Sequence, residues 1–272
     1  TIRKSTQKMQ NVTLENMAKA YGGVPALSGV TLTLQSGRVH ALMGENGAGK
    51  STLIKLSAGV VPADSLRLVK DGRELPLTNA RDAYDAGFRF IHQELNIVPQ
   101  VSVAENILLG RPFPRRYGLA VNWSAVRQTA QTALNFLGAD HIDVNELAGS
   151  LPAGDKMLIK IAAALVADEG EAADVYVLDE PTAALTGAES EMLFRVLEKL
   201  KHDGAAILYV SHRMDEVLRI CDDITVLRDG GHVSTGRVED TTKEKIIHAM
   251  TGRDVKDAYP PRDSDMLEKP VV

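Results

Sequence analysis

Four short apolar runs in this chain each stop at residues that can take part in phosphate chemistry. The runs Val39–Met43, Phe88–Ile91, Val175–Leu178 and Ala206–Val210 lead into Gly44–Ser51, His92–Glu94, Asp179–Pro181 and Ser211–His212. Short runs rich in Val and Ile, separated by helical stretches, are typical of buried parallel strands in an α/β protein. Because ligands of open α/β sheets bind beyond the carboxyl ends of the strands, we expect the four polar segments to meet at one site.

The sequence between these runs predicts helices and one hairpin. Apolar residues recur at helical spacing in 192–200, and Thr186 stands three residues before Glu189, which indicates a capping box at the start of that helix. Gly204 is expected to close this helix. Residues 224–228 and 232–234 flank a Gly turn and predict a β-hairpin.

The middle of the chain differs from the rest. Residues from about 95 to 170 hold few strand-like runs and much helix-like sequence, such as Trp123–Leu137 and Asp155–Ala167. We interpret this part as a helical insertion into the α/β core. The predicted division is therefore a core at 1–94, the insertion at 95–170, the rest of the core at 171–252 and a tail or linker at 253–272.

Charge and composition exclude several classes of protein. The chain has 272 residues with 31 basic and 36 acidic side chains, a net charge of −5, and a single cysteine, Cys221. This predicts no nucleic-acid partner, since no strong basic field is present, and no polybasic patch favours direct membrane binding. One cysteine allows neither an internal disulfide nor a cysteine metal site, and the basic N-terminus lacks the apolar stretch of a signal peptide. We expect a protein of the cytosol.

The segment Gly44-x-x-x-x-Gly49-Lys50-Ser51 matches the phosphate-binding loop pattern in full. Glycines let successive backbone N–H groups turn toward phosphates, Lys50 is expected to reach the β- and γ-phosphates, and the Ser51 hydroxyl is expected to bind Mg²⁺. The predicted nucleotide-binding residues are Gly44, Glu45, Asn46, Gly47, Ala48, Gly49, Lys50, Ser51 and Thr52. The alternative for this segment is a Gly-rich turn of no function.

The other polar segments indicate a function only in combination with the phosphate-binding loop. An Asp-Glu pair after a strand is more often a solvated loop, and a histidine after a buried strand is more often structural. Together with a phosphate-binding loop, Asp179 supplies a carboxylate for the metal and Glu180 one to polarise water. Gln93 and His212 matter because they are expected at the same edge of the sheet.

These motifs resemble the ATPase subunits of ABC transporters over nearly the whole chain. Gly44–Ser51 resembles the Walker A motif, Gln93 the Q-loop, Val175–Thr182 Walker B, Ala183–Thr186 the D-loop and His212 the switch histidine. Tyr21 is similar to the aromatic residue that stacks on adenine. The resemblance implies an ABC-type P-loop NTPase fold, with an N-terminal antiparallel β subdomain and an inserted helical subdomain. It also implies ATP and Mg²⁺ as ligands.

The resemblance also implies roles for these residues. Glu180, His212 and Gln93 are expected to be catalytic, with Glu180 acting on water and His212 fixing the γ-phosphate. Ser51, Gln93 and Asp179 are expected to hold Mg²⁺. Gln93 is further expected to pass the state of the site toward a permease.

The segments Asn16–Val24, His92–Asn96, Val101–Gly110 and Thr251–Arg253 resemble the simple-sugar importers of the ribose, galactose and xylose type. In that group the ATPase chain usually holds two such domains in tandem, and this sequence is similar to the first half. The implied partners are a second ATP-binding domain, in tandem or separate, and an integral-membrane permease. A periplasmic sugar-binding protein is an indirect partner. The implied location is the cytoplasmic face of the bacterial inner membrane, through the permease.

One element departs from the family pattern. The signature Leu-Ser-Gly-Gly-Gln corresponds here to Leu151, Pro152, Ala153, Gly154 and Asp155. Pro152 offers neither the hydroxyl nor the N–H that the family's Ser provides to the γ-phosphate of the opposite subunit. The site that this chain completes on its partner is therefore expected to be weakened, which makes a regulatory half-site of an asymmetric dimer one alternative.

Other classes stay open or are disfavoured. A soluble ABC-type ATPase outside transport would share the motifs, although large insertions or basic arms are usual there. A P-loop GTPase would need Asn-Lys-x-Asp, which is absent from the sequence. An ATP-dead subunit is disfavoured because the loop, Asp179, Glu180 and His212 are all present.

Overall fold

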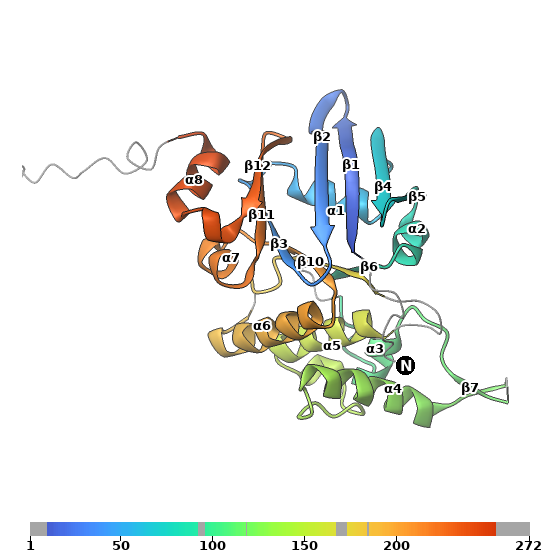
Figure 1. Ribbon diagram of the computed structural model, residues 1–272. Helices are drawn as coiled ribbons and strands as arrows, with labels where there is room; N and C mark the ends of the chain where they lie inside the picture. Colours follow the sequence, from blue (N-terminus) through green and yellow to red (C-terminus); the bar gives the residue numbers. More distant parts are fainter. Residues whose placement is uncertain (1–9, 92–95, 118, 167–172, 184, 254–272) are drawn as a thin grey trace, which may run out of the picture.

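The computed structural model describes residues 10–91, 96–117, 119–166, 173–183 and 185–253. Figure 1 shows the central strands β3, β10 and β6 lying between an antiparallel sheet on one side and a group of helices on the other. The predicted fold class, an α/β nucleotide-binding core with an antiparallel β part and a helical part, is confirmed.

A six-stranded sheet carries the ends of the predicted runs. Its order is β12-β11-β3-β10-β9-β6. The bounds are β3 Val39–Met43, β6 Phe88–Ile91, β9 Val175–Asp179, β10 Ala206–Val210, β11 Asp223–Arg228 and β12 Gly231–Arg237. The four predicted strands are direct neighbours and run parallel, so that Val210 pairs with both Leu42 and Asp179. The strand prediction is therefore confirmed, and the chain segments that follow these strands leave the same edge.

The continuous apolar character of these strands follows from burial on both faces. Along β10, the side chains of Ile207 and Tyr209 belong to one hydrophobic cluster, and those of Leu208 and Val210 belong to another. The first cluster packs against helices from the middle and the end of the chain, and the second packs against α1 and the antiparallel sheet. A strand between two cores needs apolar residues at every position rather than at every second one.

The second sheet is antiparallel, with the order β2-β1-β4-β5. Its strands are β1 Asn11–Tyr21, β2 Val24–Gln35, β4 Ser65–Lys70 and β5 Arg73–Leu75. β1 and β2 form a long hairpin, and alternate residues of β2 from Val30 to Leu34 are buried while those between them face solvent. This alternation is typical of a sheet with one covered face.

Eight helices lie in the described part of the chain, together with two short 3₁₀ turns. Their bounds are α1 Lys50–Ser57, α2 Ala80–Asp85, α3 Val103–Leu108, α4 Trp123–Leu137, α5 Ala153–Leu165, α6 Gly187–His202, α7 Met214–Ile220 and α8 Lys243–Thr251. The 3₁₀ turns are Ala148–Ser150 and Val238–Asp240. Among these residues, no helix combines the length and the apolar character needed to cross a membrane.

The helical insertion is α3, α4 and α5, which contact one another (Figure 1). The helix predicted at Trp123–Leu137 is confirmed with the same bounds. α5 begins at Ala153, two residues before the predicted start, with Pro152 as its N-cap residue. The insertion also contains a small hairpin, β7 Arg115–Arg116 and β8 Ala120–Val121. The division of the chain into domains stays a prediction.

Two local predictions near the C-terminal half are confirmed. Thr186 and Glu189 form a capping box at the start of α6, in which each side chain meets the backbone N–H of the other residue. The hairpin across Asp229 and Gly230 is β11 paired with β12. In both places the turn or cap chemistry of the sequence is sufficient to fix the local structure.

Candidate active site

Three of the four predicted polar segments lie at one edge of the parallel sheet. Gly44 follows β3, Glu180 follows β9, and Ser211 and His212 follow β10. The fourth predicted residue, Gln93, lies outside the described residues. The expected convergence is thus confirmed for the loop, Glu180 and His212, since all three contribute to one pocket.

The loop at 44–49 needs glycine at defined positions. Gly47 and Gly49 have φ angles of 86° and 101°, in the left-handed region that side chains avoid. Gly44 has no such torsion, but a Cβ there would lie 2.5 Å from the carbonyl oxygen of Leu227. The loop therefore passes close to β11 before α1 begins at Lys50.

Lys50 bends back over its own loop. Its Nζ donates to the carbonyl oxygens of Gly44 at 2.7 Å and Glu45 at 3.0 Å. Desolvation by burial lowers the pKa of Lys50, while the nearby carboxylates of Glu180 and Asp179 act in the opposite direction. The ammonium group thus lies over the loop and in the electrostatic field of the two carboxylates.

Two more segments pack against the end of the loop. A Cβ on Gly49 would lie 2.8 Å from the carbonyl oxygen of Ala26 on β2, and a Cβ on Gly230 would lie 2.9 Å from the same oxygen. The N–H of Gly230 also donates to the carbonyl of Ala48 at 3.3 Å. The antiparallel sheet, the β11–β12 turn and the loop therefore meet at backbone distance.

Tyr21 lies at the end of β1, beyond this contact. Tyr21 is 46% exposed, and Nζ of Lys19 lies 5.8 Å from the centroid of its ring. An exposed aromatic face on the same sheet as Ala26 is available for stacking. Its contact with a nucleotide base stays a prediction.

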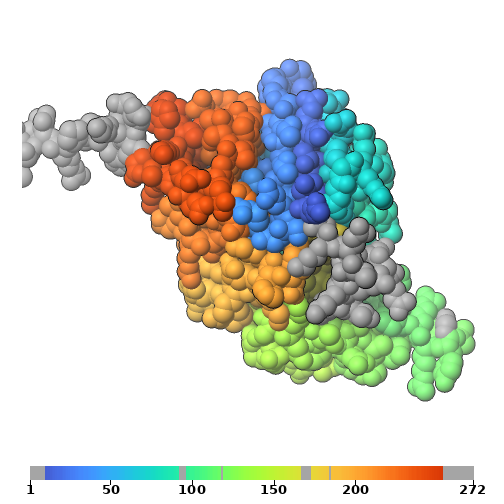
Figure 2. Space-filling model, in the orientation of Figure 1, coloured from blue at the N-terminus to red at the C-terminus, as the bar shows by residue number. Residues whose placement is uncertain are grey.

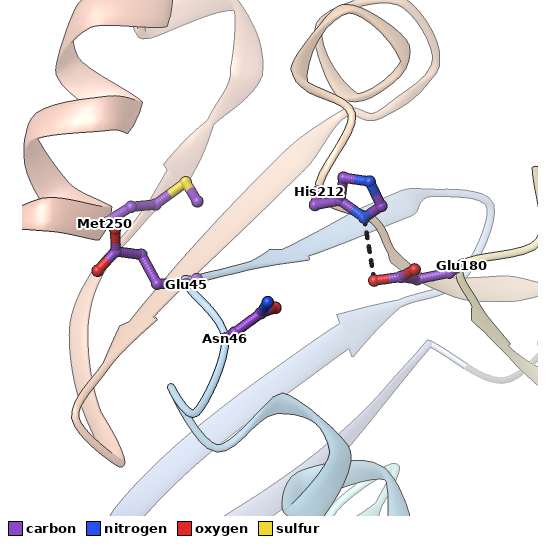
Figure 3. Close-up of a pocket in the computed structure, with 6 residues that line it drawn as sticks. Glu45, Asn46, Glu180, His212 and Met250 are labelled. Carbon is purple, nitrogen blue, oxygen red and sulfur yellow. Dashed lines mark hydrogen bonds and ion pairs between the residues drawn. The ribbon is translucent and has the colours of Figure 1, made fainter. Parts of the chain in front are cut away.

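Glu180 and His212 form a pair across the strand ends. Nδ1 of His212 lies 3.0 Å from Oε1 of Glu180 (Figure 3). Glu180 has a φ of 47°, which is uncommon for a residue other than glycine, and its N–H donates to the carbonyl of Val210 at 2.8 Å. Backbone strain of this kind gathers at functional sites, because the surrounding structure must hold it in place.

The pocket between these segments has a volume of about 640 Å³. It is lined by Gly44, Glu45, Asn46, Glu180, His212 and Met250. Figure 3 shows Glu45 and Asn46 on the loop, with Glu180 and His212 on one side and Met250 on the other. A volume of this order accommodates a small organic ligand.

Met250 is a pocket residue that the sequence reasoning missed. It comes from α8, which is held to β11 through a hydrogen bond from Arg228 Nη1 to the carbonyl of Ala249 at 3.3 Å. In the sequence, the neighbouring segment Thr251–Arg253 carries only a resemblance to the simple-sugar importers. No local pattern marks a methionine near a C-terminal helix as part of a site.

A hydrogen-bond network behind the Glu180–His212 pair was also missed. Oε2 of Glu216 accepts from the hydroxyls of Thr182 and Tyr209, both at 2.8 Å, and Oε1 accepts from Arg213 at 2.6 Å. These contacts join the segment after β9 to the segment after β10. Desolvation by burial, followed by the bond to Glu216, raises the pKa of Tyr209, so that its hydroxyl stays a donor.

The five signature residues lie at the start of α5, and none of them is among the described residues that line the pocket. Leu151 is buried, and Pro152 caps α5 without a side-chain hydrogen bond. Asp155 lies 2.9 Å from His141 Nε2. The structure therefore separates the signature from this chain's own pocket.

The predicted metal residues are only partly described. Ser51 is exposed on the first turn of α1, Asp179 ends β9, and Gln93 falls outside the described residues. In the described ranges, no three or more His, Cys, Asp and Glu residues gather in a way that could hold a metal ion. A hydroxyl and one carboxylate fit a Mg²⁺ ion that takes its other ligands from water and substrate phosphates. The Mg²⁺ site stays a prediction.

Comparison with known proteins gives consistent relatives. The sequence pattern of the family described as "ABC transporter" matches residues 27–183. The ribose import ATP-binding protein RbsA of Chromobacterium violaceum is 46% identical over 253 residues, which are 93% of this chain and 49% of that protein. The arabinose import ATP-binding protein AraG of Rhizobium etli is 45% identical over 245 residues, with 90% and 48% covered. The chain spans about half the length of the curated relatives it matches.

Solved structures agree with the fold. An ATP-binding cassette of an ABC transporter in its ADP conformation matches with a TM-score of 0.73 and 25% identity, covering 91% of this chain and all of that one. A nucleotide-free ATP-binding cassette from an ABC transporter matches with the same TM-score, identity and coverage of this chain. The layered arrangement in Figure 1 is thus similar to that of known ATP-binding cassettes.

Proposed function

The chain belongs to the ABC transporter family, and on that premise we propose that it is the ATP-binding and ATP-hydrolysing motor domain of a monosaccharide importer. The observation that carries the proposal is the Glu180–His212 pair at 3.0 Å, facing a loop that carries Lys50. A phosphate-binding loop and a carboxylate that can orient water are recurring parts of nucleoside triphosphate hydrolysis, and here an imidazole lies in the same pocket.

The loop residues 44–52 are proposed to hold the phosphates of ATP, with Tyr21 stacking on the adenine. The left-handed glycines turn backbone N–H groups toward the phosphates, and α1 adds the positive end of its dipole. Lys50 now bonds to carbonyls of its own loop. A phosphate oxygen would exchange these neutral acceptors for a charged one, which is a stronger bond.

Ser51 and Asp179 are the described residues proposed to hold Mg²⁺, together with Gln93. Bound there, the ion would neutralise charge on the phosphates. Asp179 ends β9 directly before Glu180, so the carboxylate proposed for the metal and the one proposed for water are adjacent in sequence.

Glu180 is proposed to orient and polarise the attacking water. Its strained backbone and its hydrogen bond to Val210 fix the direction in which the carboxylate leaves β9. His212 contacts Glu180 and is proposed to hold the γ-phosphate and that water. The network around Glu216 supports both segments from behind.

The proposed partners follow from the relatives. The curated matches are import ATP-binding proteins, and this chain covers about half of each. We therefore propose a second ATP-binding domain, an integral-membrane permease and, indirectly, a periplasmic sugar-binding protein. The proposed location is the cytoplasmic face of the bacterial inner membrane, through the permease. The names of these relatives do not favour a soluble ABC-type ATPase outside transport.

A weakened partner half-site is a second part of the proposal. Pro152 is the N-cap residue of α5 and has neither a side-chain cap nor an N–H. The composite site that this chain would complete on its partner then lacks two donors. The assembled dimer would hydrolyse ATP asymmetrically, with this chain's own pocket the competent one.

The proposal is tested by the substitution Glu180→Gln in the assembled transporter. We expect ATP binding to be kept and turnover to fall by a factor of about 10² to 10⁴, as is usual when a group that acts on a proton or a water is removed. Glu74→Gln, on the exposed strand β5, is the matched control and should change neither. Hydrolysis by Glu180→Gln at the parental rate would show that the role is wrong.

Two further measurements test the rest of the proposal. Titration with ATP against GTP checks the nucleotide, and co-purification with a permease checks the partner. Pro152→Ser should raise hydrolysis at the partner's site if the half-site is weak. Unchanged hydrolysis at the partner's site would show that the proposal of an asymmetric dimer is wrong, without affecting the proposal that the chain hydrolyses ATP.

A further inference from the structure

A small hairpin leaves the helical part of the molecule and extends into solvent. Strands β7 and β8 are two residues each, and Arg115 pairs with Val121 and Arg116 with Ala120. Figure 1 shows this hairpin beyond α4, on the side of the molecule away from α8, and Figure 2 shows the same projection at the lower right. It is therefore remote from the helix that supplies Met250 to the pocket.

The hairpin exposes two large apolar side chains. Tyr117 is 87% exposed and Leu119 is 91% exposed, the two highest values among the exposed large apolar residues of the described chain. Burial of a leucine side chain is normally one of the favourable terms in folding, and this leucine contributes almost nothing to it. The fold of the described residues gives no reason for an apolar tip.

The backbone at the tip is strained at the tyrosine. Tyr117 has a φ of 50°, a turn conformation usually occupied by Gly, Asn or Asp. The N–H of Leu119 donates to the carbonyl of Arg116 at 3.2 Å and closes the turn. Tyr117 makes up for this strain with little burial of its own side chain, which points to a function for the residue.

The base of the hairpin is firmly held. The N–H of Asn122 donates to the carbonyl of Pro114 at 2.7 Å, and the ring of Trp123 lies 6.0 Å from that of Phe113, which packs against the core. Arg111 donates to the hydroxyl of Tyr84 at 2.9 Å and to the carbonyl of Ala163 at 3.1 Å. The base of the hairpin is thus joined to α4 and to the core by hydrogen bonds and ring packing.

The charge of this region differs from that of the whole chain. No Asp or Glu stands between Glu105 and Asp140, although the chain has 36 of them, and the interval contains four arginines. Three of these arginines, Arg115, Arg116 and Arg127, are exposed. Trp123, which is 46% exposed, and Arg127 are four residues apart on α4 and share one helix face.

We propose that Arg115, Arg116, Tyr117, Leu119, Trp123 and Arg127 form a surface that binds the headgroup region of an anionic lipid bilayer. We call this set the hairpin surface. Arginines face the negative lipid headgroups, leucine inserts into the boundary with the acyl chains, and tyrosine and tryptophan lie at the headgroup level that amphipathic rings prefer. This goes beyond the proposed ATPase function and does not depend on it.

A lipid surface fits these residues better than a protein partner does. A stable protein interface buries about 800 Å² on each side with close packing. A tip built on strands of two residues offers neither that area nor a sheet edge of useful length. Lipid binding needs only a few inserted side chains and neighbouring cations, which is what the hairpin presents.

The chain carries its own probe for the test. Trp123 is its single tryptophan, so emission from the whole protein reports on the hairpin surface. The chain would be titrated, without nucleotide, with vesicles of phosphatidylglycerol and phosphatidylcholine in equal parts, and separately with phosphatidylcholine alone. We expect a blue shift of the emission and co-sedimentation with the anionic vesicles only, both reversed by high salt.

Two variants locate the binding. Arg115→Gln with Arg116→Gln should lower the apparent partition constant at least tenfold, and Leu119→Ser should lower it by a similar factor. The matched controls are Arg73→Gln with Arg237→Gln, and Val60→Ser, which change exposed residues elsewhere and should leave binding unchanged. ATP binding by every variant shows that the fold is intact.

Three outcomes would overturn the inference. They are no shift with anionic vesicles, an equal shift with phosphatidylcholine, and parental binding by both hairpin variants. If the hairpin variants instead lost a permease that the parent retains, with no vesicle binding by either, the surface would be a protein-docking site and the lipid proposal would be wrong. Loss of ATP hydrolysis in Glu180→Gln is a separate measurement, so the two proposals can fail independently.

Discussion

The carboxylate of Glu189 accepts a hydrogen bond from the backbone N–H of Gly154 at 2.9 Å and so joins the first turn of α6 to the first turn of α5. Its other oxygen accepts from the N–H and the hydroxyl of Thr186. These hydrogen bonds, first of all the one from the Thr186 backbone, lower the pKa of Glu189. One carboxylate therefore holds the segment after β9 and the signature residues together.

Gly154→Ala should disrupt this junction. A Cβ at position 154 would lie 2.2 Å from Oε1 of Glu189, which must move and lose its bond. We expect the free energy of unfolding to fall by about 1–3 kcal/mol in urea denaturation. Gly187→Ala is the control, because it has open space around it and should be neutral or slightly stabilising. Equal effects of the two substitutions would contradict the prediction. It would also be contradicted if Gly154→Ala cost as much in a Glu189→Ala background as in the parent.

Glu216→Ala should be costly because it removes one acceptor from three donors. Thr182 is buried and Tyr209 is fully buried, so both hydroxyls would lose their charged acceptor away from water. We expect a loss of about 2–3 kcal/mol in the free energy of unfolding and, in the assembled transporter, a larger fall in turnover than in ATP affinity. The neighbouring Asp215→Ala, at an exposed carboxylate, serves as the control. A loss below 0.5 kcal/mol, roughly the scale of a surface substitution, would show that the network is unimportant.

The phosphate-binding loop offers a matched pair of glycines. Gly49→Ala combines a φ of 101° with a Cβ 2.8 Å from the carbonyl of Ala26, whereas Gly47→Ala combines a φ of 86° with open space. The second substitution should cost only backbone strain, about 1–2 kcal/mol. The first should also push β2 from the loop, with a greater loss of stability and at least a tenfold weaker binding of a fluorescent ATP analogue. If the two variants lost the same stability and the same affinity for the ATP analogue, the close approach to Ala26 would be shown to be unimportant.

His40 should make the protein less stable in acid. Burial lowers its pKa to about 4 from an ordinary value of 6.5, and its Nε2 lies 2.8 Å from the hydroxyl of Thr225. Well above pH 6.5 the imidazole is neutral in both the folded and the unfolded state, and no stability is lost. Between pH 6.5 and 4 the unfolded chain binds a proton that the folded chain does not. The free energy of unfolding therefore decreases as the pH is lowered through this range.

The size of this effect follows from the shift. Between pH 7 and pH 5, His40 should remove about 2 kcal/mol from the free energy of unfolding. In denaturation curves of His40→Gln, the loss in the free energy of unfolding between pH 7 and pH 5 should be smaller than in the parent by this amount. His202→Gln, at a histidine whose side chain is 90% exposed, should keep the parental slope. An unchanged slope in His40→Gln would assign the acid sensitivity to other groups.

The sequence determined the parts of this protein that depend on neighbouring residues. The buried strands, the helix at Trp123–Leu137, the capping box of Thr186 and Glu189, and the β11–β12 hairpin follow from periodicity, cap chemistry and turn chemistry. The convergence of the loop, Glu180 and His212 follows as well, because parallel strands present their carboxyl ends at one edge.

The tertiary structure decided what depends on contacts between distant segments. Met250 enters the pocket, Glu216 binds Thr182 and Tyr209, and Glu189 meets Gly154 across 35 positions only after the chain has packed. The hairpin surface is another example, since its three arginines, Arg115, Arg116 and Arg127, do not form a polybasic run in the sequence. Local patterns record which side chains a residue's own helix or strand will bury, whereas a contact between two elements depends on where the whole fold places both of them.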